Sequence, residues 1–375
     1  MCRMPWMEST SRGAANHVTS GTSMRAGCGR VGAAAEISGR LSAIQVSVSW
    51  SMNWWAGRLR SSASSLSDAV FGFGVREFIS GSSKGSGAVG VKLGVAVLTM
   101  GTRPEELAAL LASVEMQTVQ AAKVVVVGNG CALPELPHWV EAVELADNLG
   151  VTGGRNAALD HLRDVDVVID LDDDGLLVAD DVLARITALY EADSRLGIVS
   201  FRIADETGLT QRRHVPRLRA GDPMHGGEVT SFLGGGHALS SKMLQQVGDW
   251  PDAFFFAHEE TDMAWRALDA GWRVLYVPEL LLQHPRTSPT RHSFFYRVNA
   301  RNRVYLARRH LPALLVPVYL GVWVALTLAR TRDVAGLKAW FAGFAEGWRT
   351  PCGHRKPMRW RTVWTMTRLG RPPII

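Results

Sequence analysis

Three consecutive carboxylates, Asp172, Asp173 and Asp174, stand in the middle of the chain in the run LDDDG. Neighbouring carboxylates repel one another unless a cation neutralises them, and hard oxygen ligands suit Mg²⁺ or Mn²⁺, with substrate phosphates completing the coordination shell. The apolar run 165–171 before them is typical of a buried strand, so the triplet falls where that strand ends. We therefore expect a divalent-cation site rather than the solvated turn that an acidic triplet alone would indicate.

A second group of acids, Glu259, Glu260 and Asp262, lies in the run HEETD directly after three phenylalanines. The pattern predicts a short helix that begins at these acids and ends at Gly271. A helix N-terminus favours the ionised carboxylate, so we expect a general base here to remain charged at neutral pH. Helix capping is the alternative role for each acid taken alone.

His284 and two glycine-rich runs are weaker candidates. A lone histidine is usually structural, and only a nearby metal would make His284 a ligand. The run NLGVTGGRN, residues 148–156, predicts a strand-to-helix turn whose backbone N–H groups could approach a diphosphate. It matches neither of the common glycine-rich phosphate patterns. The glycines at 234–236 predict either a close-packed turn or a floor against which a sugar can lie.

Strands and helices must alternate to position these groups. Apolar runs predict strands at 91–99, 124–127, 165–171, 197–201 and 273–277. A capping box of Thr102 and Glu105 predicts one helix, and Asp180 is expected to cap another. The alternation predicts an α/β fold with a mainly parallel sheet and helices on both sides. Ligands of such sheets bind beyond the carboxyl ends of the strands, where the acidic triplet lies.

Composition sets the outer limits. A chain of 375 residues with 47% hydrophobic and 20% charged residues excludes a disulfide-stapled mini-protein and a wholly disordered chain. Four cysteines without metal-ligand spacing predict neither a disulfide framework nor a zinc site, and favour a reducing compartment. The net charge of +6 divides into +5 for residues 1–90, −7 for 91–310 and +8 for 311–375. We expect no nucleic-acid partner, because the middle of the chain is acidic.

The two ends differ from the middle. Residues 1–90 contain 18 Ser and 13 Gly, and we expect a disordered extension. The alternatives are an over-extended translation start, which would have no function, and a basic tail that contacts membrane or nucleic acid. No apolar run typical of a secretory signal follows Met1, which favours a cytoplasmic protein. Residues 311–329 carry no charge and span about 28 Å as a helix, with basic residues and tryptophans around them.

For residues 311–375 we therefore expect a membrane-associated helical and basic tail. Basic flanks on both sides favour a shallow hairpin or an interfacial segment at the cytoplasmic membrane face over a single span. A buried helical pair, or a helical interface in a homo-oligomer, is the alternative.

In combination the motifs resemble the family 2 glycosyltransferases of the GT-A fold. They are a TxxRP-like turn after the first strand, NxGxxGGRN, DDD, GGG, an acidic pair-x-Asp motif followed by WRA, and a late histidine, in the family's order from about Val91 to Pro312. The run at 301–303 and the apolar stretch after it look most like rhamnosyl- or galactofuranosyl-type enzymes of bacterial surface polysaccharide synthesis. The resemblance implies a GT-A domain at 91–310 with an apolar and amphipathic helical extension.

The resemblance also implies roles for single residues. Asp174 would bind Mn²⁺ or Mg²⁺ with Asp172 and His284, and Glu260 would be the general base. Glu259 would be its neighbour and Asp262 would orient the acceptor, although many relatives have Asp at the position of Glu260. The positions implied for nucleotide-sugar binding are Thr99, Thr102, Arg103, Asn129, Arg155, Asn156, Asp172, Asp173, Gly235, Gly236, Trp265 and Arg266.

The function implied is an inverting transfer of a sugar from a nucleoside diphosphate to a hydroxyl of a glycan or lipid-linked acceptor, in cell-envelope polysaccharide synthesis. One alternative is a sugar nucleotidyltransferase, which would need a glycine-rich phosphate loop with Arg or Lys directly after the first strand; residues 100–103 supply one Gly. The other is an inactive, membrane-tethered carbohydrate-binding protein. Pure binding would not require Asp174, Glu260 and His284 together.

Overall fold

The structure, a computed structural model, describes residues 90–218, 221–286 and 293–375. These residues belong to one compact unit, residues 87–375. The predicted disordered extension lies outside the described residues, apart from Gly90. All the motifs that could carry chemistry fall within the described ranges.

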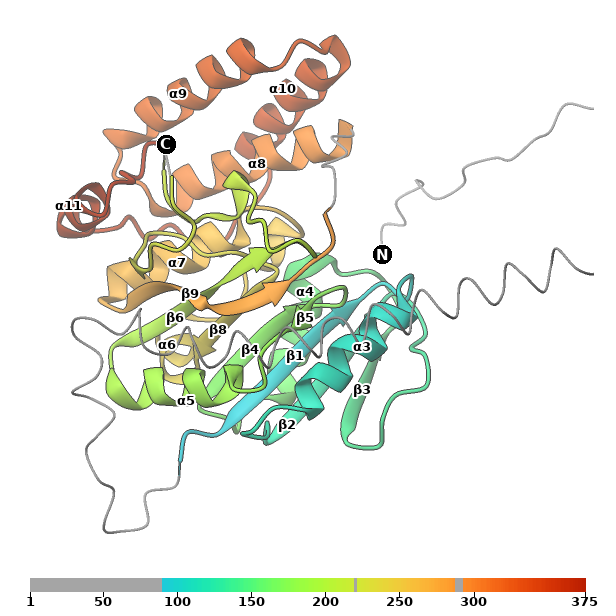
Figure 1. The fold of residues 1–375 in the computed structure, drawn as a ribbon. Helices are drawn as coiled ribbons and strands as arrows, with labels where there is room; N and C mark the ends of the chain where they lie inside the picture. Colours follow the sequence, from blue (N-terminus) through green and yellow to red (C-terminus); the bar gives the residue numbers. More distant parts are fainter. Residues whose placement is uncertain (1–89, 219–220, 287–292) are drawn as a thin grey trace, which may run out of the picture. The chain divides into compact units, whose positions relative to one another are not determined.

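A nine-stranded mixed sheet forms the centre of this unit (Figure 1). The strands follow the order β3-β2-β1-β4-β8-β6-β9-β5, and β7 pairs with β9. The longer ladders are parallel: β1 with β2 and β4, β2 with β3, and β6 with β9. The strands are β1 (Leu93–Thr99), β2 (Lys123–Asn129), β3 (Val140–Leu145), β4 (Val167–Asp172), β5 (Leu176–Leu177), β6 (Leu196–Ala204), β7 (Gly227–Glu228), β8 (Gly236–Ser240) and β9 (Arg273–Gln283).

Helices cover both faces of the sheet because strand residues alternate between them. Val95 and Val97 of β1 pack in one core with α3 and α5, whereas Ala96 packs in a second core with α4, α6 and α7. The helices are α3 (Pro104–Glu115), α4 (Gly150–His161), α5 (Val182–Ala192), α6 (Ser241–Val247), α7 (Glu259–Ala270), α8 (Ser293–His310), α9 (Leu315–Arg330), α10 (Val334–Arg349) and α11 (Trp360–Arg368), with 3-10 turns at Arg212–His214 and Asp252–Phe254. The predicted α/β fold is confirmed.

The predicted helix starts need correction. α3 begins at Pro104 after Arg103, and no side chain caps it, so Thr102 and Glu105 do not form a capping box. α5 begins one residue later than expected, after Asp181, again without a side-chain cap. The proline at the first position of α3 explains the first case, because its fixed φ starts the helix without a cap.

The C-terminal helices pack on the sheet domain through α7 and α8. A third core joins Trp265 of α7, Val304 of α8, Tyr319 of α9 and Met366 of α11. α10 lies against α8 at close range: a Cβ added at Gly343 would lie 1.9 Å from the carbonyl oxygen of Arg297. Among the described helices, none combines the length and the apolar character needed to cross a bilayer.

Candidate functional site

A cavity of about 540 Å³ opens at the sheet edge where β1, β2 and β4 end. The register places Leu98 beside Asp172 and Thr99 beside Gly128, so the three strand ends are level. This is the edge at which ligands of parallel sheets bind. The predicted site residues that line the cavity are Thr102, Arg103, Asn129, Arg155, Asp172, Asp173, Gly235, Glu259, Glu260 and His284.

Asp172, Asp174 and His284 form a cluster in which one ligand atom of each lies within 4.8 Å of the others. Nδ1 of His284 lies 2.9 Å from the carbonyl oxygen of Pro285 and so carries the hydrogen. Nε2 therefore faces Asp174 Oδ1, 3.0 Å away, and this buried oxygen has no hydrogen bond. A histidine that donates to a carbonyl and presents its other nitrogen beside carboxylates fits a divalent-cation site.

Asp174 itself lies just behind the cavity wall, and Arg103 and His284 stabilise its ionised carboxylate. Arg103 Nη1 is 2.5 Å from Asp174 Oδ2 and 3.2 Å from Asp173 Oδ1. Burial would raise the pKa of Asp174, but His284 and Arg103 hold it below its ordinary value. In return, the nearby Asp174 carboxylate raises the pKa of His284. Asp174 is therefore an ionised carboxylate at neutral pH.

Thr99 supports the same triplet from behind. It is 1% exposed, and its hydroxyl donates to Asp173 Oδ2 at 2.6 Å. Thr99 does not line the cavity and orients Asp173, and its predicted contact with a nucleotide stays a prediction.

The two glutamates at the start of α7 differ. Glu260 is half-buried, lines the cavity and has no hydrogen-bond partner among the described residues. Glu259 is 2% exposed, and burial together with Glu260 raises its pKa to about 8, against the opposing effect of Arg155. For Glu259, burial outweighs the effect of the helix N-terminus, which favours the ionised carboxylate.

The backbone before α7 is strained where it delivers these glutamates. Phe255, Ala257 and His258 have φ of 61°, 68° and 71°. A non-glycine residue in this region costs about 1–3 kcal/mol, and such residues cluster at functional sites. Gly234 makes room opposite, since a Cβ there would lie 2.3 Å from Glu260 Oε1.

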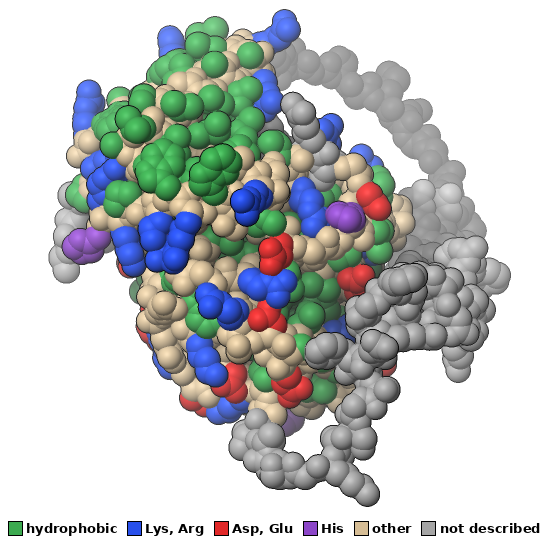
Figure 2. Space-filling view, turned by 90° about the vertical axis from the view of Figure 1, so that its left-hand side faces the viewer, with side chains coloured by type: hydrophobic (Ala, Val, Ile, Leu, Met, Phe, Trp, Pro, Cys, Tyr) green, Lys and Arg blue, Asp and Glu red, His purple; other side chains and the backbone are tan. Residues whose placement is uncertain are grey.

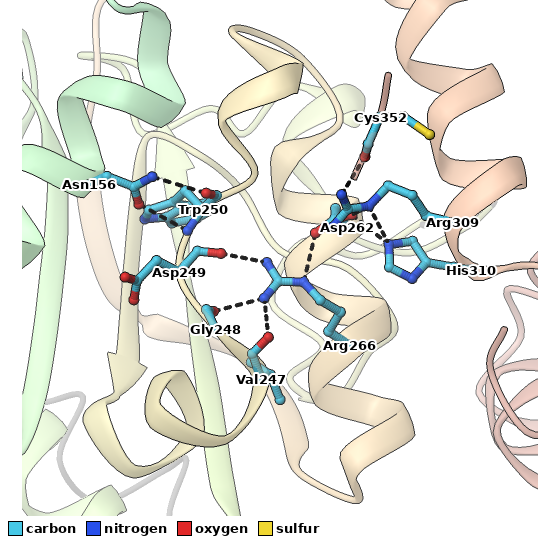
Figure 3. Close-up of polar contacts among 10 residues, drawn as sticks. All are labelled: Asn156, Val247, Gly248, Asp249, Trp250, Asp262, Arg266, Arg309, His310 and Cys352. Carbon is cyan, nitrogen blue, oxygen red and sulfur yellow. Dashed lines mark hydrogen bonds and ion pairs between the residues drawn. The ribbon is translucent and has the colours of Figure 1, made fainter. Parts of the chain in front are cut away.

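Asp262, two residues after Glu260, lies in a closed network (Figure 3). It is fully buried and contacts Arg266 Nε at 2.7 Å, Arg309 Nε at 2.9 Å and His310 Nε2 at 2.5 Å. Burial alone would raise its pKa, but His310 and Arg266 hold it well below the ordinary value. These contacts tie α7 to the end of α8, and the predicted role of Asp262 in orienting an acceptor stays a prediction.

Four further predicted substrate residues also have structural contacts instead. Arg266 binds Asp262 and the carbonyl oxygens of residues 247–249 (Figure 3). Asn156 bonds the backbone of Trp250. Trp265 is 5% exposed in the third core, and Gly236 packs on Phe201 and Leu282. None of the four lines the cavity.

The glycine-rich turn does not offer free donors to a diphosphate. The N–H groups of Leu149, Gly150 and Val151 donate to the side-chain oxygens of Asn129 and Asn148 and to the carbonyl oxygen of Phe255, respectively. The predicted contact of backbone N–H groups with a diphosphate therefore needs correction at these three positions, because acceptors within the protein already bind the N–H groups at the start of α4.

Sequence reasoning missed a buried polar group beneath the cavity. Asp170 lies on β4, with His237 Nε2 at 3.2 Å and Arg155 Nε at 3.8 Å. Arg155 also donates to the Gly234 carbonyl at 2.7 Å and lies 4.9 Å from the Trp250 ring centroid. The available signal was an acid inside an otherwise apolar strand, since such a residue is seldom buried unless it is paired.

The second omission is an aromatic side of the cavity. Phe255, Phe256 and Phe294 line it, and the rings of Phe255 and Phe294 meet edge to face at 6.3 Å. The run of phenylalanines before α7 was visible in the sequence, but Phe294 comes from α8, and no local pattern predicts that contact.

Comparisons with known proteins agree with this geometry. Residues 167–343 match the model of a family described as Glycosyl transferase family group 2. The fold is similar to GalNAc-T7 solved with UDP, GalNAc and Mn²⁺, with a TM-score of 0.50, 13% identity, and coverage of 70% of this chain and 56% of that one. It is also similar to S. aureus TarS, with a TM-score of 0.50, 16% identity, and coverage of 69% and 49%.

A shorter form, S. aureus TarS 1–349 in complex with UDP-GlcNAc, matches with a TM-score of 0.50, 15% identity, and coverage of 68% of this chain and 80% of that one. The chain spans about half the length of GalNAc-T7 and of full TarS. No curated protein matches the sequence. These similarities confirm the predicted GT-A fold.

Proposed function

We propose that this chain is a family 2 glycosyltransferase of the GT-A fold that moves a sugar from a nucleoside diphosphate to an acceptor hydroxyl. One observation carries the proposal: two members of the metal-ligand cluster, Asp172 and His284, line the same cavity as Glu260, which has no hydrogen-bond partner among the described residues. A transferase of this kind needs a cation site for the leaving diphosphate and a base for the attacking hydroxyl. The family match and the GT-A fold support the same class.

Asp172, Asp174 and His284 would hold the metal, Mn²⁺ or Mg²⁺. When bound, a divalent cation neutralises the charge that develops on the departing diphosphate. The protein's own part is to keep Asp174 ionised, through Arg103 and His284, and to hold His284 in the tautomer that presents Nε2. Arg103, Thr102 and Asn129 line the same cavity and are proposed to contact the nucleotide.

Glu260 is proposed to take the proton of the acceptor hydroxyl at its free carboxylate. Glu259 is the poorer base at neutral pH, because burial raises its pKa to about 8. A single displacement by the deprotonated hydroxyl would invert the anomeric carbon. Glu259 and Arg155, whose Oε1 and Nη1 atoms are 3.9 Å apart, are proposed to orient the sugar beside Glu260.

The acceptor is proposed to be a glycan or lipid-linked hydroxyl at the cytoplasmic membrane face, in cell-envelope polysaccharide synthesis of the rhamnosyl- or galactofuranosyl-transferase type. Figure 2 shows hydrophobic side chains gathered over the upper part of the face that carries α9 and α11, with Lys and Arg around them. The exposed apolar residues of these two helices include Val318, Leu328, Trp360 and Trp364. An apolar face with a basic surround is typical of peripheral membrane binding.

A donor screen tests the proposed function. The full chain is incubated with UDP-, dTDP- and GDP-sugars, with and without Mn²⁺, and released nucleoside diphosphate and the melting temperature are measured. We expect one donor to raise the melting temperature and to release nucleoside diphosphate only with metal. No shift and no release with any donor would contradict the proposal, and formation of nucleoside triphosphate from a donor only when pyrophosphate is added would indicate a nucleotidyltransferase.

A further inference from the structure

A second, smaller cavity lies away from the sheet edge, among α7, α8, α9 and the segment after α11. Its volume is about 50 Å³. A water molecule needs about 10–15 Å³ by this measure, so the cavity has room for a group the size of a few waters. It is lined by Thr230, Ser231, His258, Thr261, Trp265, Arg303, Tyr319, Trp323, Met366, Arg371, Pro372, Pro373 and Ile375.

Two arginines converge on this cavity without a counter-charge. The Arg303 guanidinium carbon lies 3.2 Å from the ring centroid of Trp323, and Arg371 Nη1 donates to Ser231 Oγ at 2.6 Å. Among the described residues, no carboxylate oxygen lies within 4.0 Å of either guanidinium. Burial lowers the pKa of both arginines, and the repulsion between them adds to the effect on Arg303. Buried cations without an anion are unfavourable.

Further donors around the cavity have no partner. Thr230 is 2% exposed, and its hydroxyl makes no hydrogen bond. The buried indole nitrogen of Trp323 also lacks an acceptor. Buried polar groups are almost always paired in proteins, so each of these orphans requires an explanation. Both belong to residues that line the cavity beside Arg303 and Arg371.

We propose that this cavity binds an oxyanion of the phosphate class through Arg303, Arg371, Thr230 and Trp323. The two guanidinium groups and the indole N–H are donors only, and the hydroxyl can act as a donor. Together they can donate hydrogen bonds to several phosphate oxygens. The bound anion would supply the missing counter-charge. The site is separate from the donor cavity, and no lining residue is shared between the two.

The phosphate can come from a free anion or from a lipid headgroup. The second source fits the position of the cavity, because α9 supplies both Tyr319 and Trp323 to its wall and the exposed apolar Val318 and Leu328. The two cavities are linked by adjacent residues of the chain. His258 lines the smaller cavity, and the next residue, Glu259, lines the donor cavity.

The first arm of the test uses inorganic phosphate and the full chain. Phosphate is titrated calorimetrically at constant ionic strength into the wild type, Arg303→Gln and Arg371→Gln. We expect saturable binding to the wild type and a loss of affinity of about tenfold or more in each variant. Arg330→Gln, at the exposed end of α9, and Arg103→Gln, in the donor cavity, serve as matched controls and should bind as the wild type does.

Two further variants keep this arm decisive if a glutamine variant fails to fold. Arg303→Lys retains the charge but loses the fork of donors, and Thr230→Val removes one hydroxyl at nearly constant volume. Both should fold and bind phosphate more weakly. The proposal is overturned if the wild type shows no saturable binding, if the cavity variants bind as tightly as the wild type, or if Arg103→Gln abolishes the binding.

The second arm distinguishes the source of the phosphate. The same proteins are floated with phosphatidylglycerol vesicles and with phosphatidylcholine vesicles. A lipid headgroup as the occupant predicts that Arg303→Gln weakens binding to phosphatidylglycerol far more than Arg330→Gln does. Free phosphate as the occupant predicts that the two variants bind vesicles equally while only Arg303→Gln loses inorganic phosphate. Neither readout depends on sugar transfer, so failure of the proposed function would leave this test intact.

Discussion

Glu260 and Asp262 lie two residues apart on α7, yet they belong to opposite kinds of site. Glu260 faces a cavity of about 540 Å³ and has no hydrogen-bond partner among the described residues. Asp262 is fully buried between Arg266, Arg309 and His310. The difference follows from the helix period, because residues two apart point to different sides of a helix. A carboxylate without hydrogen-bond partners, such as Glu260, is available to accept a proton. A carboxylate with three cationic or histidine contacts, such as Asp262, instead links the elements that carry those side chains.

The same contrast separates two histidines. His284 presents Nε2 to Asp174, whose buried oxygen has no hydrogen bond, and the cluster can accept a cation. His310 closes the network around Asp262, which two arginines already neutralise. Carboxylates outnumber arginines in the Asp172, Asp173, Asp174 and Arg103 group, whereas two arginines surround the single carboxylate of Asp262. Unbalanced charge at the donor cavity is the feature that points to chemistry.

The largest expected effect comes from the open cluster. Asp174→Asn should lower sugar transfer about 10³-fold, because a metal site stabilises the leaving charge by several kcal/mol, while the fold stays intact. Initial rates at saturating donor, with and without Mn²⁺, provide the measurement. Glu191→Gln, at an exposed position of α5, is the matched control. Wild-type activity in Asp174→Asn would contradict the proposed role of Asp174 in the metal site.

The closed network predicts a loss of stability instead. Asp262→Asn leaves buried cations unpaired and should lower the free energy of unfolding by about 3–5 kcal/mol. Urea denaturation followed by circular dichroism measures this change. Asp160→Asn, which breaks an exposed pair with Arg163, should cost about 1 kcal/mol or less. Equal losses in the two variants would show that the Asp262 network is not special.

A smaller effect is expected from the glycine that faces Glu260. Gly234→Ala places a methyl group 2.3 Å from the present position of Glu260 Oε1, so the flexible carboxylate must move. Activity should fall about tenfold to a hundredfold, because misplacing a catalytic group by about 1 Å can cost that much. The melting temperature should change little. Unchanged kcat with normal stability would argue against the present position of the base.

A separate effect is expected in the pH dependence of stability. The folded-state pKa of Glu259 is raised to about 8 from an ordinary 4.5, so the folded chain keeps a proton that the unfolded chain releases. Stability should therefore fall as pH rises from about 4.5 to 8 and level off above that range. Glu259→Gln should flatten this slope, and Glu135→Gln should not. Asp262 contributes no slope in this window, because its pKa is lowered and it is ionised in both states.

Much of the donor cavity could be predicted because its residues follow strand ends. The acidic triplet begins at the last residue of β4 and His284 follows β9. The strand pattern predicted the position of the triplet, and the family resemblance added His284 to it. The parallel sheet then fixes that neighbouring strands end at one edge. The division of labour between Glu259 and Glu260 was less accessible, because it depends on burial.

The closed regions could not be predicted, because their partners are distant in the sequence. Asp262 meets His310 across 48 residues, and Arg371 meets Ser231 across 140 residues. Such contacts follow from how α7, α8 and the C-terminal segment pack, and no local period encodes them. The motif around Asp262 suggested chemistry, and only tertiary packing assigns it to structure.

The most direct test compares Glu260→Gln with Asp262→Asn at a temperature where both variants are folded by circular dichroism. Nucleoside diphosphate release from the donor that binds the wild type is measured with Mn²⁺. The account predicts that folded Asp262→Asn retains most of the wild-type rate, whereas Glu260→Gln loses about 10²- to 10⁴-fold, as expected for removal of a general base. A Glu260→Gln variant with the wild-type rate, or a folded Asp262→Asn variant without activity, would contradict it.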